Sequence, residues 1–193
     1  MASSNFGKLK EFALLLPEFE IISQTSLGII PEEETGETFI ENSMQKARVA
    51  NNASGLAALG DDSGLIVPAL NYLPGLHSAR YAHKDANDKE NREHLKTELE
   101  KINLATAQAY FVCVLVLVQA AKDPFPLIAT GLLEGIIKIE SQGSNGFGYD
   151  PMFYPLGSDK SLAEIGSQRK AKISHRGKAA ETLRQKIKDF VSQ

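Results

Sequence analysis

One apolar run, residues 110–120, constrains the fold of this chain more than any other feature. The run is continuous and rich in β-branched side chains, which is typical of a strand that is covered on both faces. A second long strand is expected over residues 127–139, which carry Gly131 and Gly135. With 193 residues, the chain suits one domain, with room for two lobes, and can bury a substantial core around these strands.

Helical patterns alternate with the strands. A helix is expected over residues 5–16, and Pro17 ends it. One face of this helix contains Leu9, Phe12, Ala13 and Leu16. Capping patterns predict further helices that begin at residues 38, 87 and 161, and a last helix after residue 174. A short strand at residues 56–59 is expected to end just before Gly60. The class is therefore α/β, with a central mixed sheet flanked by helices.

Charge and cysteine content narrow the functional classes. The net charge of −3 argues against a general nucleic-acid binder, which needs a basic surface. A single cysteine, Cys113, cannot form a disulfide within the chain, which suits a reducing cytoplasm. It lies in the apolar run, where we expect a small core residue. The apolar stretch of residues 110–121 is shorter than the roughly 20 residues of a membrane-spanning helix. We therefore expect a cytoplasmic protein without membrane partners.

The first polar cluster surrounds the start of the first helix. It consists of Ser3, Ser4, Asn5, Phe6, Gly7 and Lys8. A helix N-terminus offers free N–H groups and a favourable dipole for anions, and Lys8 adds a charge, so this segment could hold a triphosphate. The alternative is an ordinary helix cap with a solvated lysine. The chain has no Walker-type lysine loop, which excludes a P-loop NTPase.

The second cluster is acidic. Its members are Glu32, Glu33, Glu34, Glu37, Glu41, Asp61 and Asp62. The two aspartates follow the expected short strand, where open sheets place ligands. Carboxylate oxygens suit Mg²⁺, and a carboxylate beside the ion can take a proton from an attacking water. The alternatives are a solvated run for Glu32 and Glu33, a helix cap for Glu41 and a simple turn for the aspartate pair.

The third cluster combines the glycine-rich segment 143–151 with Ser174, His175 and Arg176. The small residues around Phe147 could expose its ring to a flat ligand, and stacking on a base is worth roughly 1–3 kcal/mol. Arg176 offers a planar fork of donors, which would suit the 6-oxo group of hypoxanthine but not the 6-amino group of adenine. A hydrogen-bond mismatch of this kind can discriminate between two bases by roughly 10⁴. The alternatives are core packing for Phe147 and a surface position for His175.

In this order the motifs resemble those of the inosine triphosphate pyrophosphatase family, the non-canonical purine NTP pyrophosphatases. The match includes Ser-x-Asn-x-x-Lys, Glu-Asn-x-x-x-Lys-Ala, Asp-Asp-Ser-Gly-Leu, Gly-Phe-Gly-Tyr-Asp-Pro and Ser-His-Arg-Gly. It spans nearly the whole chain. The resemblance implies an elongated α/β fold in two lobes with the active cleft between them, a homodimer, and cleavage of ITP, dITP and XTP to the monophosphate and pyrophosphate by attack at the α-phosphorus.

The resemblance also assigns roles. Glu34, Asp61 and Asp62 would bind Mg²⁺, Asp62 would also be the general base, and Ser63 would contact the substrate. Phosphates would be held by Ser3, Ser4, Asn5, Phe6, Gly7, Lys8 and Lys46. Phe147 would stack on the purine, with Gly148, Tyr149 and Asp150 shaping that wall, and the 6-oxo face or phosphates would be read by Lys170, His175 and Arg176.

One departure from the family pattern lies at the start. Family members carry several more apolar residues, forming a first strand, where this sequence has only Met1 and Ala2 before Ser3. We expect lower stability and weak activity from the lost sheet pairing, with chemistry unchanged in kind. Two other functions stay open: a non-catalytic oxopurine nucleotide-binding protein, and a related pyrophosphatase for modified pyrimidine or 7-methylated nucleotides.

Overall fold

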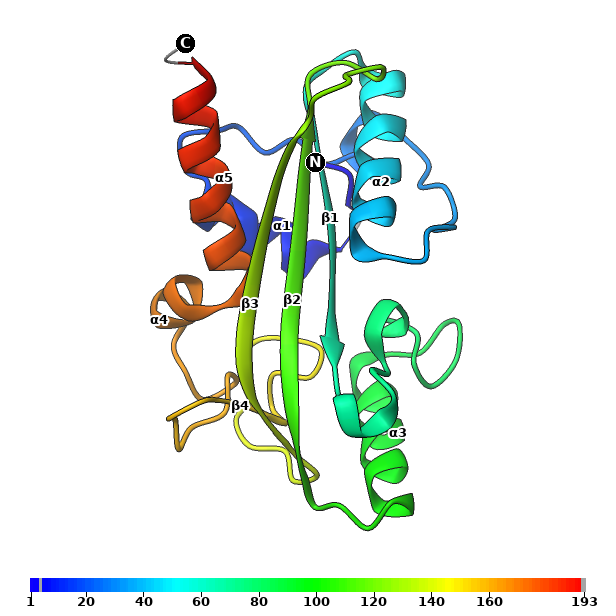
Figure 1. Ribbon diagram of the computed structural model, residues 1–193, viewed down its shortest axis with the longest axis vertical. Coiled ribbons are helices and arrows are strands. Elements are labelled where there is room, and N and C mark those ends of the chain that lie inside the picture. Colours follow the sequence, from blue (N-terminus) through cyan, green and yellow to red (C-terminus); the bar gives the residue numbers. More distant parts are fainter. Residues whose placement is uncertain (4, 192–193) are drawn as a thin grey trace. The chain divides into compact units, whose positions relative to one another are not determined.

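The computed structural model describes residues 1–3 and 5–191, and contains one sheet of four strands in the order β1-β2-β3-β4 (Figure 1). The strands are β1 (Ala58–Ile66), β2 (Thr106–Val118), β3 (Leu127–Lys138) and β4 (Phe153–Pro155). β3 and β4 are antiparallel, with Gly135 opposite Pro155. Where the family pattern has a first strand, this chain has one parallel bridge that joins Ala2 to Gly60 of β1. The two long strands expected from the sequence are confirmed as β2 and β3.

Five α-helices accompany the strands in the described part of the chain. They are α1 (Phe6–Leu15), α2 (Phe39–Ser54), α3 (Asp88–Lys101), α4 (Ser167–Ile173) and α5 (His175–Val191). The side chains of Asn5, Thr38 and Asn87 cap the first three, so these predicted starts are confirmed. The start predicted at Ser161 is wrong: the Ser161 N–H donates to Glu164 Oε2 at 2.8 Å, but this closes a turn, and α4 begins at Ser167.

The largest difference from the sequence-based expectation concerns β1. The strand runs unbroken from Ala58 to Ile66, so Asp61 and Asp62 lie inside it and do not follow its end. Neighbouring side chains of a strand point to opposite faces of the sheet. The carboxylates of Asp61 and Asp62 therefore lie on opposite faces of the sheet and contact different residues.

Contacts divide the chain into two compact units. The first comprises Met1–Asp62, Cys113–Gly131 and His175–Gln193, and the second comprises Ser63–Val112 and Leu132–Ser174. The chain passes from one unit to the other within β1, within β2, within β3 and between α4 and α5. The expected cleft between lobes stays a prediction.

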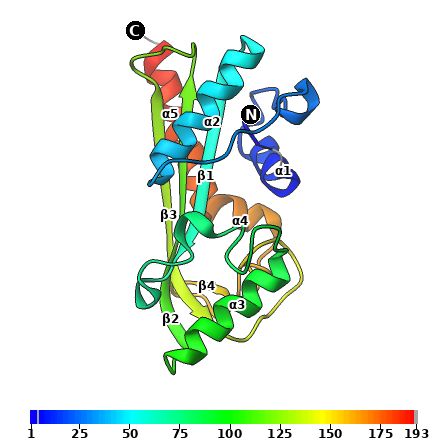
Figure 2. The same ribbon diagram turned by 90° about the vertical axis from the view of Figure 1, so that its right-hand side faces the viewer.

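In the first unit, helices pack on both faces of the strands (Figures 1 and 2). α2 lies against Gly60 of β1, and α5 lies against Gly131 of β3. On the α5 side, α1 and α5 close a core that contains Phe12, Cys113 and Leu183. Cys113 is fully buried there, which confirms its predicted place in the core. These helices bring their polar side chains to the middle of β1.

Gly60 allows α2 to approach β1 closely, because a Cβ at this position would lie 2.0 Å from the Ser43 carbonyl oxygen. We therefore expect Gly60→Ala to lower the free energy of unfolding by about 3 kcal/mol or more, at the upper end for overpacking. Chemical denaturation measures this. Gly166→Ala is the control, since a Cβ there meets nothing within 4 Å and the loss should stay below about 1 kcal/mol. Equal losses in the two variants would contradict this close packing.

The second unit has its own core beneath α3. Leu95 and Leu99 of α3 are fully buried against residues of β2 and β3 and against Tyr149, Met152 and Phe153. This core fixes the glycine-rich segment 143–151 through the buried Tyr149. Among the described residues, no helix combines the length and apolar character needed to cross a membrane.

Candidate active site

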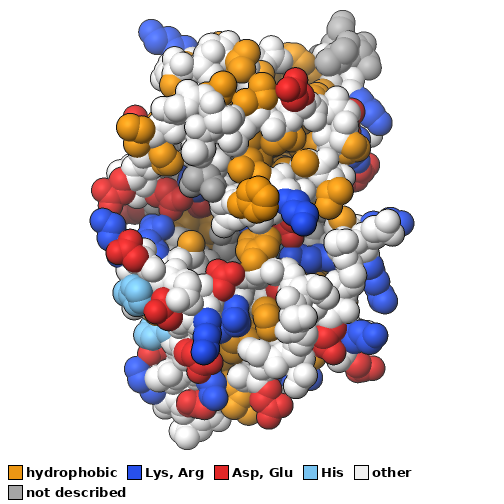
Figure 3. All heavy atoms as spheres, turned by 180° about the vertical axis from the view of Figure 1, so that it is seen from behind, with side chains coloured by type: hydrophobic (Ala, Val, Ile, Leu, Met, Phe, Trp, Pro, Cys, Tyr) orange, Lys and Arg blue, Asp and Glu red, His pale blue; other side chains and the backbone are white. Residues whose placement is uncertain are grey.

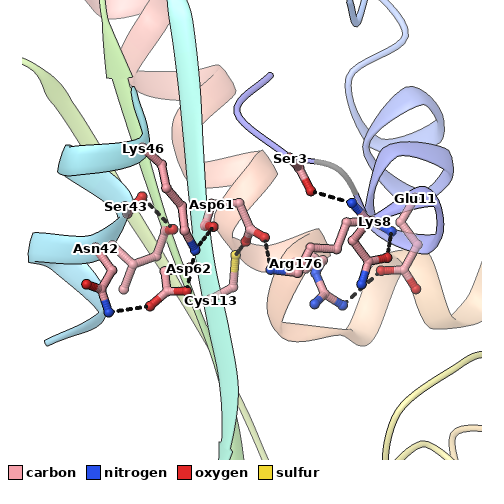
Figure 4. A network of polar contacts seen from close by, with 12 residues as sticks. Ser3, Lys8, Glu11, Asn42, Ser43, Lys46, Asp61, Asp62, Cys113 and Arg176 are labelled. Carbon is pink, nitrogen blue, oxygen red and sulfur yellow. Dashed lines mark hydrogen bonds and ion pairs between the residues drawn. The ribbon is translucent and has the colours of Figure 1, made fainter. Parts of the chain in front are cut away.

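Asp61 points to the α1 side of β1 (Figure 4). Its Oδ2 lies 2.5 Å from Lys8 Nζ of α1, and its Oδ1 accepts from the Cys113 thiol at 3.3 Å. The side chain is 1% exposed, so its charge depends on protein partners for stabilisation. Burial, followed by the nearby Asp61 charge, raises the pKa of the Cys113 thiol. The thiol therefore stays protonated and can donate to the carboxylate.

Asp62 points to the α2 side of β1, toward Lys46 (Figure 4). It shares the Lys46 ammonium with Glu34. Lys46 Nζ lies 2.7 Å from Asp62 Oδ1 and 2.6 Å from Glu34 Oε1. The same group donates to the Asp61 carbonyl oxygen at 3.2 Å. Two carboxylates from separate segments therefore converge on one cationic group.

Asn42 and Gln45 of α2 hold the acidic loop next to this pair. Asn42 Nδ2 donates to Asp62 Oδ2 at 3.4 Å, and Asn42 Oδ1 accepts from the Gly36 N–H at 2.8 Å. Gln45 Nε2 donates to the Glu33 carbonyl at 2.9 Å. Both residues were missed as site residues in the sequence, although Asn42 belongs to the Glu-Asn-x-x-x-Lys-Ala motif. The Asn42 amide connects the acidic loop directly to Asp62.

The electrostatics of this pair favour a basic carboxylate. Burial raises the pKa of Asp62; Lys46 acts in the opposite direction, and the nearby Glu34 charge adds to the rise. For Lys46, burial disfavours the charged form, but Asp62 and Glu34 outweigh it and raise the pKa of the ammonium. Lys46 is thus held charged beside a carboxylate that binds protons more readily than an ordinary aspartate. Such a carboxylate suits a general base.

The start of α1 is built as its sequence predicts. Asn5 Oδ1 accepts from the Lys8 N–H at 3.1 Å, and Ser3 Oγ accepts from the Asn5 N–H at 3.2 Å. Phe6 is exposed, and Gly7 is half-buried. Ser4 lies outside the described residues. The helix start thereby places the Lys8 ammonium on Asp61 rather than in solvent.

His175 and Arg176 begin α5 and are both buried. The surface position considered for His175 is therefore wrong. Arg176 Nη1 lies 3.1 Å from Glu11 Oε2, which ties α5 to α1. The first unit thus assembles Lys8, Glu34, Lys46, Asp61, Asp62 and the buried His175–Arg176 pair.

The second unit contains the other predicted residues. Asp150 Oδ2 accepts from the Phe147 N–H at 2.9 Å and from Lys170 Nζ at 2.6 Å, and this ammonium also lies 4.9 Å from the centre of the Phe147 ring. The Tyr149 hydroxyl donates to the Ser78 carbonyl at 2.9 Å. Ser63 follows Asp62 in β1 and is half-buried. Phe147 is half-buried too.

Carboxylates fit a divalent cation, provided that most of its ligands come from elsewhere. No group of three His, Cys, Asp or Glu side chains that could hold a metal occurs among residues 1–3 and 5–191. Glu34 and Asp62 nevertheless present oxygens around the Lys46 ammonium, which is a position that stabilises positive charge. Mg²⁺ usually takes one or two carboxylates and completes its shell with water and phosphate oxygens. The donor set therefore suits Mg²⁺ in the presence of a phosphate ligand.

Charges elsewhere on the surface are mixed. On the face drawn in Figure 3, acidic and basic side chains are interspersed. This distribution agrees with the net charge of −3. Anion binding by this chain therefore depends on local cations such as Lys8 and Lys46.

Residues 1–186 match the family model described as "Ham1 family". The chain belongs to the Ham1 family. Ham1 relatives include the dITP/XTP pyrophosphatase of Legionella pneumophila (strain Paris), 48% identical over 98% of this chain and 97% of that protein. The enzyme of the same name from Haemophilus influenzae is 49% identical over 97% of each chain. The resemblance inferred from the motifs is thus confirmed.

Solved Ham1 structures share the fold. The HAM1 protein of Coxiella burnetii has a TM-score of 0.88 at 45% identity, covering 97% of this chain and 96% of the other. The Staphylococcus aureus Ham1 protein has a TM-score of 0.84 at 36% identity, with the same coverage. These similarities confirm the predicted α/β class.

Proposed function

We propose that this chain hydrolyses non-canonical purine nucleoside triphosphates, namely dITP, ITP and XTP, to the monophosphate and pyrophosphate, and thereby cleanses the nucleotide pool. Ham1 relatives at 48–49% identity carry the name dITP/XTP pyrophosphatase. The observation that carries the proposal is the Lys46 ammonium, 2.6 Å from Glu34 and 2.7 Å from Asp62. A cation held by two acidic groups, one of which is the basic carboxylate of Asp62, suits phosphoryl chemistry.

The phosphates would be bound by the residues at the start of α1 and by two lysines. Lys8 and Lys46 supply positive charge, and the α1 N-terminus adds free N–H groups and its dipole. Ser3 and Asn5 shape this turn through their hydrogen bonds. Phosphoryl transfer depends mainly on positioning and on neutralising charge, and these groups provide both.

Glu34 and Asp62 would hold Mg²⁺, because their oxygens converge on one position. This assignment removes Asp61 from the expected set of Glu34, Asp61 and Asp62, since Asp61 contacts Lys8 and Cys113 on the other side of β1. Asp61 would instead orient the Lys8 ammonium. An ion held by Glu34 and Asp62 would offset charge on the phosphates during transfer.

Asp62 would act as the general base. It lies beside the proposed ion, where it could accept a proton from the water that attacks the α-phosphorus. Asn42 and Lys46 hold both of its oxygens and thereby fix its orientation. Such orientation keeps the base in reach of one water position.

Phe147 would stack on the purine, with Gly148, Tyr149 and Asp150 shaping the wall around it. Lys170, His175 and Arg176 would supply donors for the 6-oxo group or the phosphates, and Ser63 would contact the substrate. We further propose a homodimer, on the resemblance to the pyrophosphatase family. The single cysteine, which is free and buried, favours a location in the reducing cytoplasm.

A panel of nucleoside triphosphates, incubated with and without Mg²⁺, tests the proposed activity. We expect pyrophosphate as the first product from dITP, ITP and XTP, with a strong preference over ATP and a requirement for the ion. Donors matched to a 6-oxo group can discriminate by roughly 10⁴. Orthophosphate as the first product would refute the reaction. Binding of ITP without turnover would favour the non-catalytic alternative, and preferred cleavage of modified pyrimidine nucleotides would favour the related pyrophosphatase.

A further inference from the structure

The peptide groups on both sides of Gly148 are held by α3. The Gly148 N–H donates to Asp88 Oδ2 at 2.7 Å, and the Gly148 carbonyl accepts from Arg92 Nη1 at 2.7 Å. The first bond fixes the peptide that joins Phe147 to Gly148, and the second fixes the peptide that joins Gly148 to Tyr149. Both backbone dihedral angles of Gly148 are thereby restrained.

Gly148 needs this restraint because it has a φ of +60°, and glycine adopts positive and negative φ about equally readily. A Cβ at Gly148 would meet nothing within 4 Å, so neighbouring side chains do not hold it sterically. On the Phe147 side, Asp150 accepts from the Phe147 N–H and donates its own N–H to the Phe147 carbonyl at 3.2 Å. On the Tyr149 side, the hydroxyl donates to the Ser78 carbonyl, and the Tyr149 carbonyl accepts from the Met152 N–H at 3.0 Å. The Asp88 and Arg92 bonds therefore act between two other anchors of the loop.

Asp88 and Arg92 are four residues apart on α3, which places them on the same side of the helix. The helix itself is fixed by the capping box of Asn87 and Glu90 and by the buried Leu95 and Leu99. Asp88 is exposed, so its side chain is not required by the core. A rigid helix thus presents an acceptor and a donor to a single glycine.

We infer that Asp88 and Arg92 are positioning residues that set the orientation of the Phe147 ring and thereby the affinity and selectivity for the purine base. This inference rests on the proposed stacking role of Phe147. Neither residue is placed among the groups that touch the reacting atoms. Loss of either bond should therefore weaken base binding and leave the chemical step intact.

Steady-state kinetics on dITP and ATP test the inference in the full-length chain. Asp88→Ala and Arg92→Met should each raise KM for dITP about tenfold, the effect of one charge-assisted hydrogen bond, and change kcat by less than about threefold. The preference for dITP over ATP should fall in the same variants. Asp88→Asn keeps an acceptor oxygen without the charge and should recover about half of the effect on KM, counted as free energy.

Matched controls come from the same helix. Glu93→Ala removes an exposed carboxylate, and Lys96→Met removes a cation whose only ion pair among the described residues is a 3.9 Å contact with Glu100. Both should leave KM unchanged. A second readout uses the absence of tryptophan from this chain: Phe147→Trp introduces a single indole at the loop. Its fluorescence anisotropy should drop when Asp88→Ala or Arg92→Met is added.

The outcomes separate the inference from the proposed function. If Phe147→Ala leaves KM for dITP unchanged, the stacking role fails, and the inference fails with it. If Phe147→Ala raises KM but Asp88→Ala and Arg92→Met match their controls, the inference is overturned and the stacking role stands. If Asp88→Asn is as impaired as Asp88→Ala, the negative charge at the helix start matters rather than the acceptor, and the inference is overturned as well.

Discussion

Replacing Asp62 with asparagine should lower kcat for dITP by about 10³-fold and change KM far less, because the variant keeps the shape of the side chain but loses the base. The amide oxygen of the variant can still accept from Lys46, so the fold should persist. Steady-state kinetics with dITP and Mg²⁺, accompanied by a melting curve, measure both effects. A loss confined to kcat that saturating Mg²⁺ does not restore assigns Asp62 to the chemical step.

Asp159→Asn is the matched control, since Asp159 is exposed in the turn before residue 161. It should retain wild-type kcat. If Asp62→Asn kept full turnover, Asp62 would not be the base. If its melting temperature fell together with its activity, the loss would instead reflect misfolding of β1.

Replacing Lys46 with methionine should lower both stability and activity. The variant leaves Glu34 and Asp62 beside each other without the shared ammonium, which should cost about 2 kcal/mol of the free energy of unfolding, below the figure for fully buried pairs because these side chains are partly exposed. Removing one group that stabilises charge in the transition state should also lower kcat/KM by about 10²-fold. Denaturation and kinetics measure the two losses.

Mg²⁺ provides a sharper readout of the same variant. Because Glu34 and Asp62 would lose their ammonium partner, added Mg²⁺ should raise the melting temperature of Lys46→Met more than that of the wild type. Arg48→Met, which removes an exposed cation from the same helix, should behave like the wild type. No difference in the Mg²⁺ response would contradict the Glu34–Asp62 ion site.

Local chemistry explains which parts of the fold could be predicted. The side chains of Asn5, Thr38 and Asn87 each accept from backbone N–H groups a few residues away. Because these bonds are local, the helix starts could be predicted from the sequence. Ser161 makes only the reciprocal bond of a capping box, from its own N–H to Glu164 Oε2, while its hydroxyl donates to the Gln142 carbonyl at 2.6 Å, and the chain turns instead. A capping pattern therefore reports a local hydrogen bond, and only the packing that follows decides whether a helix continues.

The aspartate pair shows why the site was only partly predictable. Glycine, aspartate and serine around Asp61 and Asp62 favour turns, which led to the expected end of the strand. Contacts distant in sequence override this preference: α2 packs closely on Gly60, Lys8 pairs with Asp61, and Lys46 pairs with Asp62. The motif identified which residues matter, but the division of the two carboxylates between opposite faces of β1 required the structure.

The contacts of Asn42, Asp88 and Arg92 were also not predictable from the sequence, although the Glu-Asn-x-x-x-Lys-Ala motif contains Asn42. Each acts on the backbone or side chain of a segment elsewhere in the chain, and an asparagine, aspartate or arginine on a helix is most often solvated. A single sequence contains no sign of such pairings. They became apparent only from the distances.

Hydrolysis of dITP in water enriched in oxygen-18 tests most directly whether water attacks the α-phosphorus. Mass spectrometry of both products locates the new oxygen. Attack at the α-phosphorus predicts one labelled oxygen in the deoxyinosine monophosphate and none in the pyrophosphate. Label in the pyrophosphate, or release of labelled orthophosphate, would contradict the account.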